Sequence, residues 1–277
     1  MNPKEWLRFY MEMAQWFGVE GLYFPSAKEP PDASSPPAQQ GRAASEQGEK
    51  GEVVRAQPSL ASAPQAGLFG EEEASELLVV PTEDRRKALH VIEEAVANCT
   101  KCPLAQTRTK VVPGVGDPHA QLMLIGEAPG AQEDKRGLPF VGPAGQLLTK
   151  MLSAIQIQRE AVYITNVVKC RPPRNRDPQP EEIASCRPFL QAQLRLISPK
   201  VILALGAFAA RTILSKPPKV SLSSLRGKVW ELHSGKLLVI ATYHPSALLR
   251  YPQYKKLAWQ DLQLLQRTLS SLSSQEA

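Results

Sequence analysis

The sequence predicts an α/β fold: a three-layer αβα sandwich around a central, mostly parallel, four-stranded sheet. Two patterns predict it. Short apolar runs alternate with longer segments in which apolar residues recur at helical spacing. Two of these runs end in loops that contain glycine or proline, as strands do at the edge of an open sheet. Because strands and helices alternate, we expect parallel pairing with helices on both faces.

The expected elements follow one another from residue 84 onward. Leu89, Ile92 and Val96 recur at helical spacing within residues 84–98. The expected strands cover residues 121–125, 162–168, 200–205 and 237–242. The helices expected after them cover residues 144–155, 180–196, 207–214 and 253–272. The chain shows no internal repeat.

The chain divides into unequal parts. Aromatic residues at helical spacing predict an amphipathic helix within residues 1–25. Residues 26–82 are rich in Pro, Ala and Glu and show no hydrophobic period, so we expect a disordered linker there. We assign residues 83–272 to one folded domain and residues 273–277 to a tail.

Charge is distributed unevenly along the chain, whose formal net charge is +6. Residues 1–83 hold 6 Lys and Arg against 13 Asp and Glu, and residues 84–277 hold 27 against 14. This basic C-terminal part favours a polyanionic partner such as nucleic acid, although a basic surface without a specific partner gives the same count. No apolar window is long enough to span a membrane, and charged residues interrupt any signal peptide at the N-terminus. We therefore expect a cytoplasmic protein.

The cysteines of the chain are Cys99, Cys102, Cys170 and Cys186. Disulfides are disfavoured in the cytoplasm, so these residues need another role. Four thiolates with one close pair match the ligand set of a structural zinc ion or of an iron–sulfur cluster. Spacing alone does not separate these two metals, and buried free cysteines are the remaining alternative.

Two loops at strand ends carry the candidate chemistry. Residues 126–130, which include Glu127, follow one apolar run, and residues 244–250, which include His244, follow another. Ligand sites in open α/β sheets form at the carboxyl ends of the strands. A carboxylate and an imidazole can therefore face each other across one cleft, which suits a small, flat, polar ligand.

Several ordered motifs between residues 99 and 269 make the chain similar to a known family. They lie at residues 126–134, 137–145, 165–176 and 244–250. Together with the four cysteines, they resemble the family 4 uracil-DNA glycosylases. The resemblance implies the uracil-DNA glycosylase fold and a [4Fe–4S] cluster ligated by Cys99, Cys102, Cys170 and Cys186. It also implies a monofunctional enzyme of base excision repair, which hydrolyses the N-glycosidic bond of a flipped-out deoxyuridine and leaves an abasic site.

The resemblance further implies roles at the substrate site. His244 is the expected donor to the oxygen where negative charge gathers on uracil, and Glu127 is expected to stabilise the cationic sugar. Phe140 is expected to stack on uracil, and Asn166 to pair with its edge, because a carboxamide both donates and accepts. Glu133 is expected to exclude the methyl group of thymine. The expected substrate-binding set is Ala128, Gly130, Glu133, Phe140 and Asn166, and the group that activates the water stays open.

We expect the protein to act as a monomer and to bind single- or double-stranded DNA through residues beside these motifs. The loop next to the cysteines offers basic side chains for phosphate contacts: Lys169, Arg171, Arg174 and Arg176. The second loop offers residues that would enter the minor groove or contact phosphate: Ser246, Leu248, Leu249 and Arg250. An ordinary amphipathic helix start also explains this second group.

A peptide in the expected linker, Gln65-Ala66-Gly67-Leu68-Phe69, resembles those that bind the bacterial sliding clamp. A short apolar pair in a disordered, acidic tether suits docking of this kind. Motifs this short also occur by chance.

Three other functions stay open at this level. The first is a glycosylase for other deaminated bases, such as hypoxanthine. The second is a protein that captures uracil-containing DNA without turnover. Relatives of that kind carry an added basic loop with a histidine, whereas the loop at residues 171–178 is short and has no histidine. The third is a non-catalytic iron–sulfur domain, which would lack one or more of Glu127, Asn166 and His244, and all three are present.

Overall fold

The computed structural model describes residues 53–55, 85–232 and 237–275. The expected N-terminal helix, nearly all of the expected linker and the clamp-like peptide at residues 65–69 lie outside these residues and stay predictions. The expectation of disorder was wrong for residues 53–55, because they form a strand that pairs with the sheet. The predicted boundary between the domain and a tail at residue 273 was wrong, because the last helix, α10 (Lys255–Gln275), continues past that position.

One sheet of seven strands crosses the domain, in the order β1-β6-β7-β5-β3-β4-β2. Its centre is four parallel strands, as expected: β7 (Leu237–Thr242), β5 (Val201–Leu205), β3 (Leu122–Gly126) and β4 (Tyr163–Asn166). Antiparallel strands β2 (Val115–Gly116) and β6 (Val229–Leu232) flank this centre, and β1 (Val53–Arg55) pairs with β6. The sheet is therefore wider than the four strands expected. The sequence did not reveal the flanking strands because β2 has two residues and a glutamate interrupts β6.

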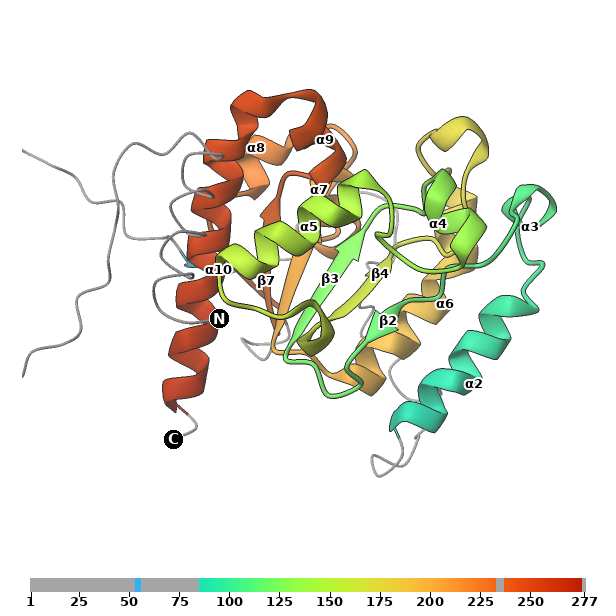
Figure 1. Cartoon of the computed structure of the whole chain (residues 1–277), viewed down its shortest axis with the longest axis horizontal. Coiled ribbons are helices and arrows are strands. Elements are labelled where there is room, and N and C mark those ends of the chain that lie inside the picture. The colour runs from blue at the N-terminus through green and yellow to red at the C-terminus, as the bar shows by residue number, and fades with distance from the viewer. Residues whose placement is uncertain (1–52, 56–84, 233–236, 276–277) are drawn as a thin grey trace, which may run out of the picture.

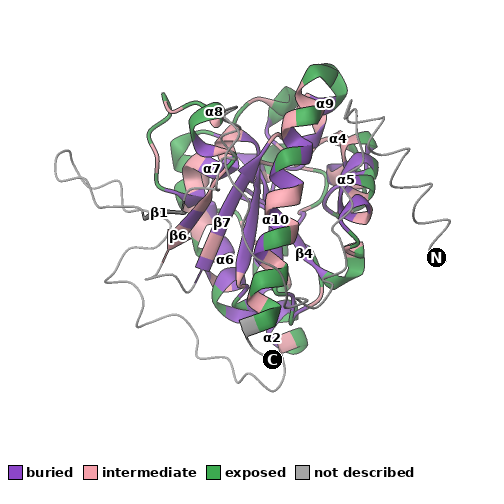
Figure 2. Cartoon of the chain, turned by 90° about the vertical axis from the view of Figure 1, so that its left-hand side faces the viewer, coloured by how far each residue is buried: buried purple, intermediate pink, exposed green. Residues whose placement is uncertain are grey.

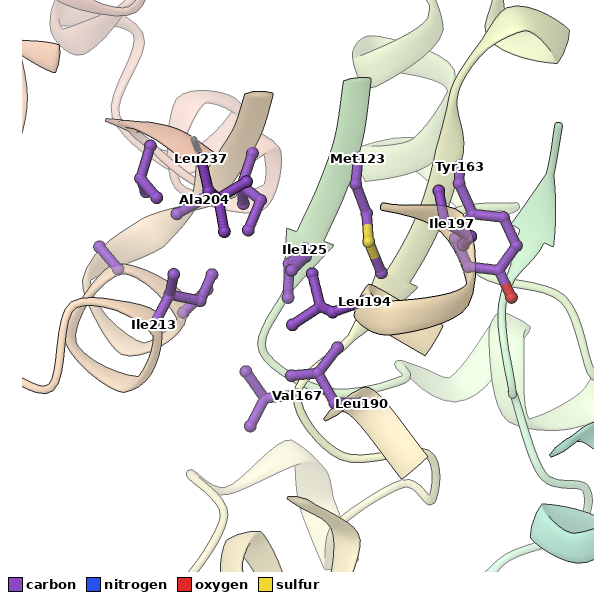
Figure 3. Close-up of a cluster of buried hydrophobic side chains, with 14 of the residues drawn as sticks. Met123, Ile125, Tyr163, Val167, Leu190, Leu194, Ile197, Ala204, Ile213 and Leu237 are labelled. Atoms are coloured by element: carbon purple, nitrogen blue, oxygen red, sulfur yellow. The ribbon is translucent and has the colours of Figure 1, made fainter. Parts of the chain in front are cut away.

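Helices cover both faces of the sheet, which confirms the three-layer arrangement (Figure 1). One layer consists of α2 (Arg85–Ala97), α6 (Pro180–Ile197), α7 (Gly206–Ile213) and α8 (Leu222–Leu225). The other consists of α5 (Pro143–Ala154), α9 (Pro245–Arg250) and α10. Strands alternate between the two, so Met123 and Ile125 pack in the first core (Figure 3), and Leu122 and Leu124 pack in the second. The central strands are accordingly buried (Figure 2).

Most expected elements are present, with a few differences at their ends. The helices expected at 84–98, 144–155, 180–196 and 207–214 are α2, α5, α6 and α7. The helix expected at 253–272 is α10, which begins at Lys255. The strand expected over 162–168 is shorter, because the chain bends after Asn166 toward the cysteines. The short helices α3 (Leu104–Thr107), α4 (Ala131–Arg136) and α8 were not expected, since helices of four to six residues show no hydrophobic period.

The four parallel strands end at the same edge of the sheet. In the strand register Gly126 lies opposite Asn166, and Leu205 lies opposite Thr242. The loops that follow these strands therefore meet, which is what positions the candidate site. None of the helices in the described residues is long and apolar enough to cross a membrane.

Candidate active site

A cavity of about 640 Å³ opens where the parallel strands end. The ends of β3 and β4, the start of α7 and the loop that enters α9 contribute to its walls. It brings together all residues predicted for catalysis and substrate binding: Glu127, His244, Ala128, Gly130, Glu133, Phe140 and Asn166. These residues are far apart in the chain, so it is the common edge of the sheet that assembles them.

Asn166, the last residue of β4, is buried, and its side-chain oxygen Oδ1 has no hydrogen-bond partner. A buried acceptor without a donor costs about 1–3 kcal/mol, so this atom is suited to a donor that a ligand brings. The neighbouring position in the register, Gly126, leaves the space it needs. A Cβ there would overlap Oδ1 of Asn166 and lie 2.7 Å from Cζ of Phe140.

The Phe140 ring is held in a fixed position. Its backbone adopts φ of 52°, the left-handed region that non-glycine residues rarely enter. Arg159 donates to the Phe140 carbonyl at 3.1 Å, and a Cβ at Gly145 would overlap that same carbonyl. On the other side, Oε1 of Glu133 accepts from the backbone N–H groups of residues 141 and 142, both at 2.9 Å. The loop around the ring is thus preorganised before any ligand binds.

His244 is the N-cap of α9, and its ring lies 5.5 Å from that of Phe140. The Ser246 backbone N–H donates to Nδ1 of His244 at 3.2 Å, and the Ser246 hydroxyl lies 2.8 Å from the same nitrogen. Because Nδ1 accepts, the neutral ring carries its proton on Nε2. Burial lowers the pKa of His244 to about 4, and the charge of Arg250 acts in the same direction. At neutral pH the imidazole is therefore a neutral hydrogen-bond donor.

Glu127 shows the opposite shift. Burial raises its pKa to about 7, the negative charge of Asp177 adds to the effect, and the Arg211 guanidinium opposes it. Asp177 and Arg211 line the same cavity, but no pattern in the sequence indicated them. Arg211 comes from α7 and Asp177 from the loop before α6, and only the folded chain brings them beside Glu127.

Lys169 does not bind DNA as predicted, because its side chain is fully buried. Its ammonium donates to Thr165 Oγ1 at 2.6 Å, to the Asn166 carbonyl at 2.7 Å and to Gln193 Oε1 at 2.7 Å. Its backbone N–H donates to Sγ of Cys186 at 3.3 Å. Lys169 therefore lies between the cavity and the cysteines and fixes the end of β4.

The other predicted DNA contacts have different surroundings. Leu248 is wrong as a DNA contact, because it is buried in the core beneath α9, whereas Leu249 is 46% exposed. Arg176 lines the cavity but is paired with Glu182, with 2.6 Å between Nη2 and Oε1. Arg174 is exposed, and Arg171 is half-buried and donates to Asn175. Ser246 and Arg250 both line the cavity.

The four cysteines line one separate pocket and form no disulfide. Arg108 donates to Sγ of Cys170 at 3.2 Å, as the Lys169 backbone does to Cys186. Burial raises the pKa of Cys186 to about 11, so the free thiol stays protonated at neutral pH. Within residues 85–232 and 237–275, no three His, Cys, Asp or Glu side chains are grouped closely enough to hold a single metal ion. The donor set that is present is four thiols around a shared space.

Comparison with known proteins agrees with this geometry. The uracil DNA glycosylase superfamily matches residues 113–263, the part that contains the parallel strands and the cavity. The chain is 48% identical over 179 residues to the type-4 uracil-DNA glycosylase of Sulfurisphaera tokodaii, covering 63% of this chain and 81% of that protein. It is 49% identical to the type-4 enzyme of Archaeoglobus fulgidus (61% and 87% covered) and 50% identical to that of Thermotoga maritima (60% and 85%).

The fold and the strand-end cavity thus define a member of the uracil DNA glycosylase superfamily. Within that superfamily, the chain belongs to the type-4 uracil-DNA glycosylases.

The buried ammonium yields a stability prediction. Lys169→Met removes three hydrogen bonds and leaves their acceptors buried, so it should lower the free energy of unfolding by about 1–3 kcal/mol. Urea denaturation monitored by circular dichroism measures this. Lys135→Met, at an exposed position on α4, is the matched control and should change stability little. Equal midpoints for the two variants would contradict the role of Lys169.

Proposed function

We propose that this chain removes uracil from DNA by hydrolysing the N-glycosidic bond of a deoxyuridine turned out of the base stack. The observation that carries the proposal is the single cavity in which Asn166, Phe140 and His244 meet. It offers a flat base a ring to stack on, an amide to pair with and an imidazole donor. Membership of the type-4 uracil-DNA glycosylases and the basic charge of residues 84–277 support it.

Recognition of uracil depends on Asn166 and Phe140. Oδ1 of Asn166 lacks a donor in the protein, and N3–H of uracil would supply one, while the amide N–H₂ would donate to O4. Cytosine presents an acceptor at N3 and a donor at its exocyclic amine, so it would leave both groups of the amide unmatched. Phe140, held by Arg159 and Glu133, offers a ring whose position costs no further ordering. Exclusion of thymine by Glu133 stays a prediction. One oxygen of its carboxylate already accepts hydrogen bonds from the loop.

The chemistry is divided between His244 and Glu127. When the bond between N1 and C1′ breaks, its electron pair stays on uracil, where negative charge gathers at O2, and the sugar becomes cationic. The neutral imidazole of His244 donates from Nε2 to O2 and stabilises the departing base. The Glu127 carboxylate stabilises the cation and orients a water, whose oxygen bonds to C1′. The water proton leaves to solvent, and the uracil anion takes one up.

The DNA strand would lie over the mouth of the cavity. Arg250 lines the cavity, and Arg171 and Arg174 belong to the loop after β4, which contributes other residues to the cavity wall. Leu249 is the exposed apolar residue of α9. Leu249 is therefore the side chain suited to fill the gap left by the flipped base, in place of the buried Leu248.

We also propose that Cys99, Cys102, Cys170 and Cys186 hold a [4Fe–4S] cluster. Four free thiols around one pocket match its ligand number, and N–H groups directed at Cys170 and Cys186 suit the bonds that cluster thiolates accept. When bound, the cluster would supply a rigid cross-link between the end of α2, the loop after β4 and α6. The glycosylase reaction is a hydrolysis, so electron transfer is not part of it.

The proposed roles predict the outcome of a cleavage assay. A labelled uracil-containing oligonucleotide is incubated with enzyme and then treated with alkali, which breaks the strand at abasic sites. Asn166→Ala and His244→Ala should each lower kcat/KM by about 10²–10³-fold. His119→Ala, at an exposed histidine outside the cavity, is the control and should match the wild type. Uracil release that is unaffected by His244→Ala would refute the assignment.

The raised pKa of Glu127 predicts a pH dependence. The carboxylate forms only above a pKa of about 7, so kcat/KM should rise as pH increases through that value and then level off. His244, with a pKa of about 4, stays neutral over this range. Glu127→Gln should be slower and flat around pH 7, while Asp117→Asn, outside the cavity, should keep the rising limb. A rising limb retained in Glu127→Gln would assign it to another group.

The cluster proposal predicts the metal content. Protein purified without oxygen should hold about four iron and four sulfide per chain, measured by colorimetric assay and visible absorbance. Cys186→Ser should lose most of the iron, and Ser185→Ala, at a neighbouring position of the same pocket, should retain it. Zinc in place of iron, or full iron in Cys186→Ser, would overturn the proposal.

A further inference from the structure

Three tyrosines run from the cavity to the surface of the molecule. The Tyr243 ring lines the cavity and stacks on Tyr254, with ring centroids 4.6 Å apart and planes within 8°. The Tyr254 ring in turn meets the Tyr251 ring edge to face, with ring centroids 6.1 Å apart. Tyr251 is 50% exposed, and in the described residues it is the only aromatic among the exposed large apolar side chains. The catalytic roles above make no use of it.

The exposed ring is held in place on its inner side. The Tyr251 backbone N–H donates to the Ala247 carbonyl at the end of α9, and its carbonyl accepts from the Tyr254 N–H at 3.1 Å. The Tyr251 ring packs on Tyr254, and Tyr254 is itself stacked on Tyr243. The Tyr251 ring is therefore largely ordered before a partner binds, which lowers the entropic cost of binding.

Charge and position indicate what this partner is. The Arg250 guanidinium lies over the Tyr251 ring, 5.9 Å from its centre, and Arg250 also lines the cavity. Lys256, in the first turn of α10, is exposed. Leu249, the side chain proposed to fill the gap left by the flipped base, immediately precedes Arg250 and is exposed too. Figure 2 shows exposed residues at the end of α9, and the same helix contributes Ser246, Ala247 and Arg250 to the cavity wall. An exposed aromatic ring that is in contact with a cation and lies beside a base-binding cavity suits a nucleobase followed by its phosphate.

We infer that Tyr251 is a stacking platform for the nucleobase next to the extruded uridine on the same strand. The inference rests on the proposed function, because that function places the uridine in the cavity. It adds a binding site outside the cavity, at which any base can stack, since every base has a flat face. Arg250 holds the phosphate between the two nucleotides.

A binding cycle tests the inference. The probe is a single-stranded oligonucleotide that carries 2′-fluoro-2′-deoxyuridine, whose glycosidic bond resists hydrolysis. Two further probes replace the base on the 5′ or the 3′ side of the uridine by a baseless tetrahydrofuran nucleotide. Tyr251→Ser should bind the intact probe about 5- to 150-fold more weakly than the wild type, and Tyr251→Phe should bind it nearly as well. With one of the two baseless probes, wild type and Tyr251→Ser should bind equally.

Salt separates stacking from charge. The loss caused by Tyr251→Ser should persist as salt increases, while the loss caused by Arg250→Ala should shrink. Val91→Ser, at an exposed apolar position of α2, is the control and should bind every probe like the wild type. Thermal melting of each variant excludes a general loss of folding.

The outcomes distinguish the two proposals. If the wild type releases uracil but Tyr251→Ser binds the intact probe normally, or loses the same factor on all three probes, the platform is refuted and the proposed function stands. If the wild type releases no uracil from DNA, the proposed function fails first. Equal binding of Tyr251→Ser and wild type to one baseless probe alone supports the platform and identifies the stacked neighbour.

Discussion

The buried ammonium of Lys169 is the interaction on which the rest of the site depends. Its three acceptors are uncharged oxygens, one of which is the backbone carbonyl of Asn166. Burial lowers the pKa of Lys169 to about 7, so the amine is only partly charged at neutral pH. A polar group this deep must keep its hydrogen-bond partners in either protonation state, so Thr165, Gln193 and the end of β4 must keep their places. The same residue donates through its backbone to Cys186. Lys169 thus fixes a segment that borders the cavity at Asn166 and the cysteine pocket at Cys170.

Rigidity continues around the cavity through close backbone contacts. Phe140 lies in a left-handed conformation that the chain tolerates because Arg159, Glu133 and Gly145 hold it from three sides. Gly126 allows Asn166 and Phe140 to approach each other more closely than any side chain at that position would permit. Among the described side chains that line the cavity, Oδ1 of Asn166 is the buried acceptor that has no partner. The wall is therefore prepared for a flat ligand that brings a donor.

Burial also adjusts the two groups assigned to the chemistry. It moves both toward the neutral form, lowering the pKa of His244 to about 4 and raising that of Glu127 to about 7. A neutral imidazole donates without the cost of desolvating a cation, and the carboxylate becomes available near physiological pH. Asp177 and Arg211 act on Glu127 with opposite charges, so small movements of their elements would shift its ionisation.

The sequence by itself determined the parallel centre of the sheet and the main helices, because the hydrophobic period is a local pattern, and its strand-end loops indicated Glu127 and His244. The other residues around the cavity were implied by the resemblance to the family 4 uracil-DNA glycosylases. It did not determine β2 and β6, which are too short or too polar to stand out and exist through pairing with their neighbours. Nor could it decide which basic and apolar residues face the DNA. Lys169 and Leu248 have the chemistry of surface contacts but are enclosed by segments distant in the chain, while Asp177, Arg211 and Tyr243 reach the cavity only in the folded protein. Burial is a property of packing between remote segments, and only the tertiary structure fixes it.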